Sequence, residues 1–388
     1  MLHNFWLGRR SGNVLFILLM LTLTCNIIFY SQRYLNKSAA WENNCDLNTY
    51  LKVSMKFIES KGSKSFKEIL HSYCPGVDEN DKDVQRLIWA LFDLVNFCKK
   101  NVSITARPET NRPILTMFTS WDVNETKYIV HNNTISNWIK LKKYVNPIIF
   151  TNSSQYKKLC SDAGWTVYPI THYAAGGAPV LKTMFLKAME NFNTTYYAFA
   201  NGDILFEDGL IDTLFLLMEE MSIDNMSHPL LLIGRRTNVK YLSRKDASTH
   251  KSLRGVAREK GHLFLVNAED YFITNRNYPW KDIPNLVIGR PAYDNWLVAH
   301  ARRSNFTVID ASDTILAVHQ TTNAGNWEGH KRKFSNYNDI LLKKLKLPRR
   351  YRNGETGCTP LRTAYDLCSR IVIQERKVFP PQCHIKPG

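Results

Sequence analysis

The chain has 388 residues, enough for one large domain or two ordinary ones, and its 44% hydrophobic content is ample for a substantial core. A formal net charge of +17 is compatible with nucleic acid, an anionic membrane surface or an anionic ligand as a partner. The basic residues are scattered and no zinc-finger or RNP-type signature is present, so we expect no nucleic-acid partner.

An apolar run near the N-terminus predicts a membrane anchor. Residues 14–30 form a 17-residue run without a charge, near the short end of the range for a membrane-spanning helix. A cleaved signal peptide is the alternative, but no small-x-small cleavage site follows closely. We therefore expect a cytoplasmic tail over 1–13, a signal-anchor helix over 14–30 and a lumenal remainder, as in a single-pass type II membrane protein.

Glycosylation sequons and cysteines agree with a lumenal chain. Of the cysteines, Cys25 lies in the apolar run and seven follow it, so at least one stays free or pairs between chains. No CxxC spacing occurs, and we expect disulfide bonds rather than a metal–thiolate site. Asn-x-Ser/Thr sequons, candidates for N-glycosylation, are spread over the whole region after the run, at Asn36, Asn101, Asn124, Asn132, Asn152, Asn193, Asn225 and Asn305.

Residues 31–108 are expected to form a helical stem next to the membrane. Apolar residues between Val84 and Cys98 recur at intervals of three and four, which is typical of one buried helix face. This pattern predicts packing rather than catalysis.

From Arg112 onward, strand-like and helix-like segments alternate. Strands are expected over 113–120, 146–152, 165–170 and 195–201, with helices over 133–144, 153–164 and 178–192. This alternation predicts an α/β fold with a mainly parallel central sheet and right-handed crossovers. No G-x-G-x-x-G motif opens the first helix, so a conventional dinucleotide fold is not indicated. A ligand crevice is expected at the carboxyl ends of the strands, along Thr119, Ser120, Asn152 and Asn201-Gly202-Asp203.

The segment Asn201-Gly202-Asp203 interrupts an apolar run in "TYYAFANGDILF". Asn-Gly and Gly-Asp are ordinary turn sequences, so a simple turn is one interpretation. The other is a metal-binding strand end, because a carboxylate at the carboxyl edge of a parallel sheet faces the ligand crevice.

Four segments resemble the glycosyltransferases of the GT-A fold: "GGAPVLKTMFLKA", "YYAFANGDILF", "IGRPAYDNWLV" and "VIDASDTILAVHQ" with the tail "TTNAGNWEGH". The resemblance covers about 112–345. It implies a GT-A-like nucleotide-binding catalytic domain over 109–345, followed by a cysteine-containing C-terminal extension over 346–388. It also implies a Golgi membrane enzyme that moves a sugar from a nucleotide-sugar donor to a glycan or glycoprotein acceptor, with a homodimer as a further possibility.

The resemblance implies a metal-assisted donor site. The strand-end motif of GT-A enzymes is usually Asp-x-Asp; here Asn201 stands in the first position and Asp203 keeps the second. Asp203 and His319 are the expected ligands of Mn²⁺ or Mg²⁺, which neutralises the diphosphate leaving group. Asn201 contributes no charge, which leaves lower metal affinity or metal independence open. The expected donor-binding residues are Thr119, Ser120, Gly177, Asn201, Gly202, Asp203 and Arg290.

Asp294 is the expected catalytic base. Its place in "GRPAYDNWLV" predicts a helix start, where a carboxylate also serves as an N-cap or first-turn residue without any further role. In inverting GT-A enzymes a carboxylate at such a position deprotonates the acceptor hydroxyl, which implies a single displacement with inversion. Two other functions remain open: a non-catalytic glycosyltransferase-like protein that binds glycan or acts as a chaperone, and a nucleotidyltransferase or nucleotide-sugar hydrolase.

Overall fold

The computed structural model describes residues 107–121, 125–220, 228–323, 325–326, 328–366 and 368–384, together with five isolated residues before them. The chain divides into two compact units, Met1–Ala106 and Arg107–Gly388, and every element named below belongs to the second.

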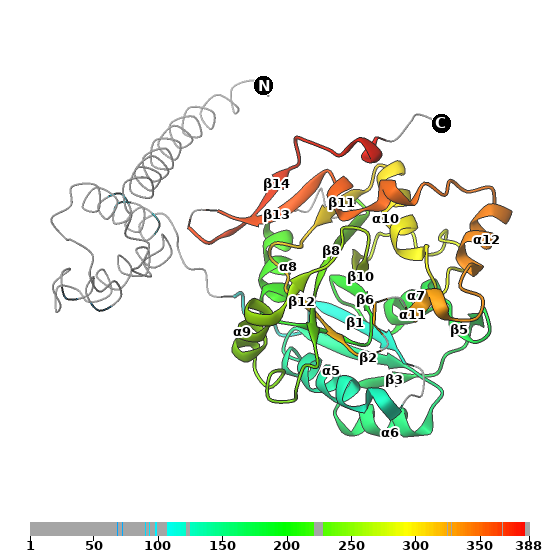
Figure 1. Cartoon of the computed structure of the whole chain (residues 1–388), viewed down its shortest axis with the longest axis horizontal. Coiled ribbons are helices and arrows are strands. Elements are labelled where there is room, and N and C mark those ends of the chain that lie inside the picture. The colour runs from blue at the N-terminus through cyan, green and yellow to red at the C-terminus, as the bar shows by residue number, and fades with distance from the viewer. Residues whose placement is uncertain are drawn as a thin grey trace. The chain divides into compact units, whose positions relative to one another are not determined.

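A twelve-stranded sheet runs through this unit (Figure 1). Its main path has the order β14-β13-β11-β8-β10-β6-β1-β2-β3, and β12, β7 and β9 pair off that path. The expected strands and helices of the first half are all present, as β1 (Leu115–Ser120), α5 (Tyr128–Lys140), β2 (Val145–Phe150), α6 (Ser154–Asp162), β3 (Thr166–Tyr168), α7 (Leu181–Asn191) and β6 (Tyr196–Ala200). Strand β1 pairs in parallel with both β2 and β6, so the predicted α/β fold with a mostly parallel sheet is confirmed.

The second half adds strands of both directions. Strand β10 lies antiparallel between β6 and β8, and β7 is antiparallel to β12. The remaining strands and helices up to residue 344 are β4 (Tyr173–Ala174), β5 (Ala178–Pro179), β7 (Ile204–Phe206), α8 (Gly209–Glu220), β8 (Leu230–Lys240), α9 (His250–Lys260), β9 (His262–Leu263), β10 (Glu269–Asn275), α10 (Tyr293–Arg303), β11 (Thr307–Asp310), β12 (Ala317–Thr321), α11 (Glu328–Lys331) and α12 (Tyr337–Lys344).

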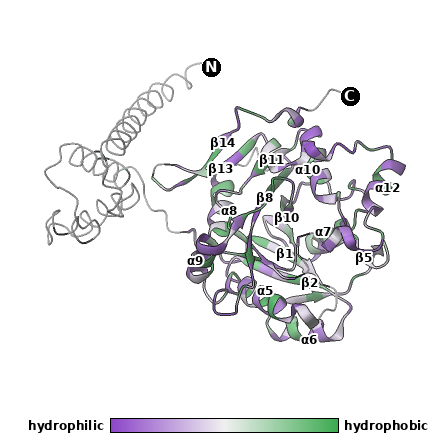
Figure 2. Cartoon of the chain, viewed as in Figure 1, coloured by the Kyte–Doolittle hydropathy of each residue, from purple (hydrophilic) through white to green (hydrophobic). Residues whose placement is uncertain are grey.

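Helices cover both faces of the sheet. Successive side chains of a strand point to opposite faces, so each strand contributes to two cores. Tyr196 and Ala198 of β6 belong to the core with α5, α6 and α8, whereas Tyr197 and Phe199 of the same strand pack with α7 and α10. In Figure 2 the central strands are largely hydrophobic and α9 and α12 largely hydrophilic, as expected for a sheet buried between helices.

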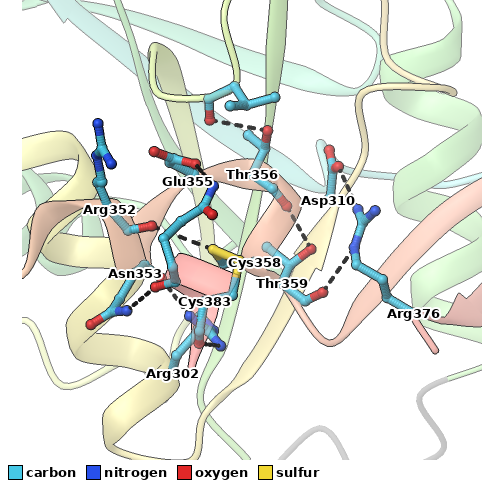
Figure 3. Close-up of a disulfide and its surroundings, with 12 residues drawn as sticks. Arg302, Asp310, Arg352, Asn353, Glu355, Thr356, Cys358, Thr359, Arg376 and Cys383 are labelled. Carbon is cyan, nitrogen blue, oxygen red and sulfur yellow. Dashed lines mark hydrogen bonds and ion pairs between the residues drawn. A yellow bond between two sulfur atoms is a disulfide. The ribbon is translucent and has the colours of Figure 1, made fainter. Parts of the chain in front are cut away.

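The C-terminal segment continues the same sheet. Strand β13 (Leu361–Tyr365) pairs in parallel with β11, and β14 (Ile371–Glu375) pairs antiparallel with β13. The short helices η2 (Tyr351–Gly354), η3 (Thr356–Cys358) and η4 (Pro381–Cys383) surround a disulfide between Cys358 and Cys383 (Figure 3). The prediction of disulfide bonds is confirmed, and Cys160 is a free, buried cysteine.

The expected localisation needs correction. The longest described helix, α5, has 13 residues, whereas a membrane-spanning helix needs about 20 predominantly apolar ones. No helix of the described residues is long and apolar enough to cross a bilayer, which contradicts the expected single-pass type II Golgi placement. The apolar run over 14–30 lies outside the described residues. So does the expected stem over 31–108, except for five isolated residues and its last two.

Candidate functional site

A cavity of about 770 Å³ opens at the carboxyl ends of β1 and β6. Its volume falls in the range of small-molecule and cofactor sites. Eight of the expected site residues lie on its wall: Ser120, Gly177, Asn201, Gly202, Asp203, Arg290, Asp294 and His319. The fold therefore brings together residues that are up to 199 positions apart in the chain.

Gly202 is required by a close approach rather than by an unusual turn. A Cβ atom at this position would lie 1.7 Å from Nε1 of Trp121, which no side chain can tolerate. Trp121 Nε1 and Thr134 Oγ1 both donate to the carbonyl oxygen of Gly202, at 3.1 and 2.9 Å. These contacts fix the backbone between β6 and β7 and hold the flanking side chains, Asn201 and Asp203, on the cavity wall.

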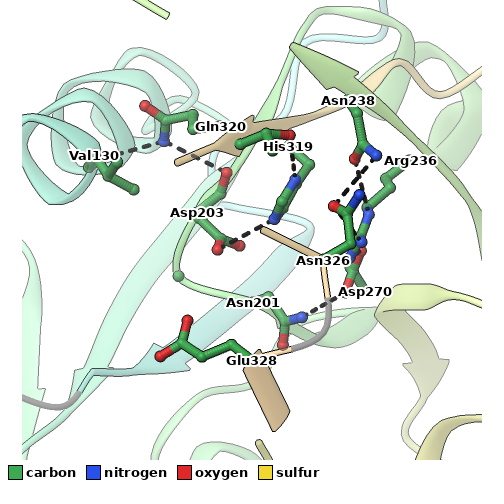
Figure 4. Close-up of polar contacts among 12 residues, drawn as sticks. Val130, Asn201, Asp203, Arg236, Asn238, Asp270, His319, Gln320, Asn326 and Glu328 are labelled. Atoms are coloured by element: carbon green, nitrogen blue, oxygen red, sulfur yellow. Dashed lines mark hydrogen bonds and ion pairs between the residues drawn. The ribbon is translucent and has the colours of Figure 1, made fainter. Parts of the chain in front are cut away.

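Asp203 and His319 form a pair at the floor of the cavity (Figure 4). Strands β7 and β12 are adjacent, with His319 opposite Ile204, which brings His319 Nε2 to 3.4 Å from Asp203 Oδ2. The other ring nitrogen, Nδ1, lies 3.0 Å from Thr321 Oγ1, so the imidazole is held from both sides. Burial alone raises the pKa of Asp203, but the charge and hydrogen bond of His319, with a further contribution from Lys127, bring it well below its ordinary value. Asp203 is therefore a carboxylate at neutral pH.

The donor set for a divalent cation is small. No group of three His, Cys, Asp or Glu side chains arranged to hold a metal occurs in the described part of the chain. Asp203 Oδ1 is nevertheless buried without a hydrogen-bond partner, and His319 lies beside the same carboxylate. One carboxylate and one imidazole fit a Mn²⁺ ion that takes its remaining ligands from phosphate oxygens and water.

Asn201 belongs to a polar network instead of pointing at Asp203 (Figure 4). Its Nδ2 donates to Asp270 Oδ1 at 2.5 Å, and its backbone N–H donates to the carbonyl oxygen of Asp270. The other carboxylate oxygen of Asp270 forms a buried ion pair with Arg236, whose Nη2 donates to Asn326 Oδ1 at 3.1 Å. No sequence pattern marked Asp270, and Arg236 resembled an ordinary surface arginine.

Asp294 lies in the first turn of α10, as its sequence context predicts. The residue before the helix, Ala292, adopts φ +81°, which turns the chain into the helix at the cavity wall. Asp294 Oδ1 is buried without a hydrogen-bond partner. Burial raises the pKa of Asp294 to about 7; the backbone N–H of Asn295 opposes this shift, and the negative charge of Asp270 reinforces it. A carboxyl group with this pKa exchanges protons readily near neutral pH.

Glu269 is a second buried carboxyl group close to Asp294 that the sequence did not reveal. Its Oε2 accepts a hydrogen bond from Asn295 Nδ2 at 2.8 Å, and its Oε1 has no partner in the described structure. Burial, followed by the charge of Asp294, raises the pKa of Glu269 well above its ordinary value. Asp294 therefore has two further acidic groups near it, Glu269 and Asp270.

Gly177 and Arg290 also line the cavity. Gly177 has φ +107° in the tight turn between β4 and β5, a conformation that favours glycine. Arg290 donates to the carbonyl oxygens of Ala175, Gly289 and Lys333, at 2.9 to 3.1 Å. The structure thus gives Arg290 a role in holding three backbone segments together at the cavity.

Thr119 and the described sequon asparagines are not among the residues that line the cavity. Thr119 is fully buried in β1, and it is not among the lining residues. Of the sequon asparagines, Asn152, Asn193 and Asn305 are exposed and Asn132 is half-buried in α5. The other four, Asn36, Asn101, Asn124 and Asn225, lie outside the described residues.

No protein-family model matches the chain, and no curated protein matches it. Among solved structures, a mannosyltransferase from Pyrobaculum calidifontis in complex with GDP-Man and Mn²⁺ is similar at 13% identity and a TM-score of 0.36, over 66% of this chain and 70% of the other. A putative nucleotide-diphospho-sugar transferase from Desulfovibrio desulfuricans G20 is similar at 9% identity and a TM-score of 0.31, over 60% and 98%.

A CMP:2-keto-3-deoxy-manno-octonic acid synthetase complexed with CTP is also similar, at 8% identity and a TM-score of 0.30, over 55% of this chain and 90% of the other. These neighbours are therefore proteins named for nucleotide-sugar transfer or synthesis. At such low identities and TM-scores the likenesses carry no argument about the chemistry of this chain.

Proposed function

We propose that this protein is a glycosyltransferase that moves a sugar from a nucleotide-sugar donor to a hydroxyl group of a glycan or glycoprotein acceptor. The observation that carries the proposal is the pair of carboxyl groups on one cavity. Asp203, held ionised, lies beside His319, and Asp294, with a pKa of about 7, lies on the wall of the same cavity. Such a divergence of pKa values is typical of residues with different roles in one reaction.

On the donor side, Asp203 and His319 would hold Mn²⁺ or Mg²⁺ together with the diphosphate. The bound cation supplies positive charge that stabilises the leaving diphosphate. Gly202 contributes by keeping the strand end rigid, because Trp121 and Thr134 fix its carbonyl oxygen. Ser120, Gly177 and Asn201 line the same cavity and are the further donor-binding residues of the proposal.

On the acceptor side, the carboxylate of Asp294 would take the proton of the attacking hydroxyl. A base matters most in the transition state, and general-base catalysis typically contributes ~10²–10⁴-fold. A single displacement by the activated hydroxyl inverts the configuration of the transferred sugar. Tyr293, next to Asp294, also lines the cavity, and its ring is buried against Phe199 and Phe272.

Release of nucleoside diphosphate from a panel of UDP- and GDP-sugars, with and without glycan acceptor and Mn²⁺, tests the proposal. We expect release that depends on the acceptor. The Asp203→Asn variant should weaken nucleotide binding in Mn²⁺, whereas Asp294→Asn should lower turnover by ~10²–10⁴-fold with nucleotide binding unchanged. Unaltered turnover in Asp294→Asn would remove it from the reaction.

One observation favours a second candidate, a non-catalytic glycan-binding or chaperone protein. The side chain of Asn201, which takes the place of the usual first aspartate, is committed to Asp270. If nucleotide binds but no sugar is released with any acceptor, this second function replaces the first.

A further inference from the structure

The network around Asn201 determines which atom this side chain presents to a ligand. A carboxylate has no hydrogen to donate, so the contact with Asp270 Oδ1 requires the Nδ2 side of the Asn201 amide. The carbonyl oxygen Oδ1 is then the atom left for other contacts, and the described structure shows no hydrogen bond to it. Because Asn201 lines the cavity, this oxygen is an acceptor available to a bound molecule.

The orientation of the amide is enforced by the fold. Strands β6 and β10 are antiparallel, with Ala200 opposite Tyr271, and the backbone N–H of Asn201 extends that ladder to the carbonyl oxygen of Asp270 at 2.8 Å. The register of β10 shifts between Glu269 and Phe272, an irregularity that re-aims side chains and is frequent beside functional sites. Asn201 and Asp270 are therefore neighbours by strand pairing.

Arg236 holds the carboxylate of Asp270 in place. The guanidinium and the carboxylate form an ion pair in which both side chains are more than nine-tenths buried. Arg236 is itself fixed from two further sides, because its Nε donates to Asn238 Oδ1 at 3.0 Å and its Nη2 to Asn326 Oδ1. Asp270 also lines the cavity, but Asn201 engages one of its carboxylate oxygens and Arg236 the other, so we expect it to act on a ligand through Asn201.

We infer that Asp270 is a positioning residue of the donor site. It holds Asn201 with Oδ1 toward the cavity, where that oxygen accepts a hydrogen bond from a hydroxyl group of the bound molecule. The inference rests on the proposed function for the nature of this molecule: in a nucleotide-sugar site, the hydroxyl belongs to the ribose. It also implies that position 201 needs an amide, because a second carboxylate there would face Asp270 at hydrogen-bond distance.

The first experiment compares the binding of UDP and GDP with that of their 2′-deoxy and 3′-deoxy analogues by calorimetry. Loss of one hydrogen bond corresponds to about a tenfold change in affinity. We expect the wild type to prefer the ribonucleotide over one deoxy analogue by about tenfold, and Asn201→Ala to bind both equally. Asn238→Ala is the matched control, because Asn238 belongs to the same network and does not line the cavity. It should keep the preference.

The second experiment exchanges the acid and the amide. Asn201→Asp places two carboxylates together and should weaken nucleotide binding by at least about tenfold in Mn²⁺, although it creates the Asp-x-Asp sequence. The exchange variant, Asn201→Asp with Asp270→Asn, again has one acid and one amide and should recover most of the affinity and the ribose preference. Thermal unfolding of each variant shows that it is folded.

The outcomes separate the two proposals. A ribose preference that survives in Asn201→Ala, or tighter nucleotide binding in Asn201→Asp, overturns the inference and leaves the proposed function standing. Ribose-selective binding without any sugar transfer overturns the proposed function and supports the inference. If neither nucleotide binds the wild type, with or without Mn²⁺, both are wrong.

Discussion

At the scale of single residues, two carboxyl groups of the same type behave differently because their surroundings differ. Asp203 is next to an imidazole and near Lys127, so its charged form is favoured despite burial. Asp294 is buried and near the negative charge of Asp270, so its protonated form is favoured. Both positions could be expected from the sequence, since Asp203 follows a recognisable strand and Asp294 lies in the first turn of a recognisable helix, while their roles stay predictions.

The pH dependence follows from the raised pKa of Asp294. In the folded protein the group releases its proton near pH 7, whereas in the unfolded chain it does so near 3.8. The folded state therefore binds more protons between these values, and its stability should fall as pH rises from about 4 to about 7. Activity should rise through the same pKa, because the base must be ionised.

Denaturant unfolding at pH 5 and pH 8 measures the first effect, and a pH profile of kcat/KM measures the second. Asp294→Asn should show a smaller loss of stability between these pH values and no acid limb in the profile. Glu269→Gln is the comparison variant, because Glu269 also has a raised pKa and its own ionisation affects stability with the same sign. A limb that remains in Asp294→Asn and disappears in Glu269→Gln would assign the titration to Glu269.

The partners of these residues were harder to predict. Asp270 and Glu269 follow an undistinguished loop, and their position beside Asn201 and Asn295 depends on the antiparallel pairing of β10 with β6 and on the bulge in β10. No local pattern encodes a contact between residues 69 positions apart. The helices and parallel strands up to Ala200 were predictable because each carries its own periodicity.

At the scale of elements, the connection between β6 and β7 determines the donor side of the proposed site. The segment Asn201-Gly202-Asp203 is a turn, and it places Asp203 on the cavity wall, while its metal-binding interpretation stays a prediction. Its geometry depends on glycine at position 202, because the indole of Trp121 occupies the space that a Cβ atom there would need. Trp121 in turn stacks on His131 of α5, with ring centroids 4.4 Å apart.

Gly202→Ala should therefore be destabilising and should also impair the site. The added methyl group would overlap the Trp121 ring, and overpacking of this kind typically costs about 1–3 kcal/mol of unfolding free energy. Nucleotide binding should fall too, since Asn201 and Asp203 flank the change. Gly255→Ala is a matched control, because Gly255 lies in α9 with open space around it, and there alanine should be neutral or stabilising by up to about 1 kcal/mol. Equal stability of the two variants would contradict this account of Gly202.

At the scale of the whole unit, the segment after residue 345 supports the proposed acceptor side. Gly354 packs so closely on the carbonyl of Asn295 that an added Cβ would lie 1.8 Å from it, and Thr356 donates through N–H and Oγ1 to the carbonyl oxygen of Val266. This segment therefore fixes Asn295, which follows Asp294, and Val266, which follows the cavity-lining residue Leu265. This support could not be predicted from the sequence, because the segment acts through backbone contacts.

The disulfide between Cys358 and Cys383 should therefore matter to stability and to α10. It encloses 25 positions, for which the chain-entropy account predicts about 3 kcal/mol of stabilisation. Around it, Asn353 Nδ2 donates to the carbonyl oxygen of Gln382, and Arg302 of α10 donates to the carbonyl oxygens of Asn353 and Cys383 (Figure 3). Replacing both cysteines by serine should lower the unfolding free energy by about this amount and loosen η2 and η4.

Hydrogen exchange measured by mass spectrometry locates the effect. Protection should fall in 351–384 and in α10, and should stay unchanged in α5 and α6, which pack on the opposite face of the sheet. Cys160→Ala is the control for loss of a sulfur that forms no disulfide, and it should leave exchange in α10 as in the wild type. If the double serine variant loses stability but α10 keeps its full protection, the C-terminal segment stabilises the unit without supporting the helix that carries Asp294.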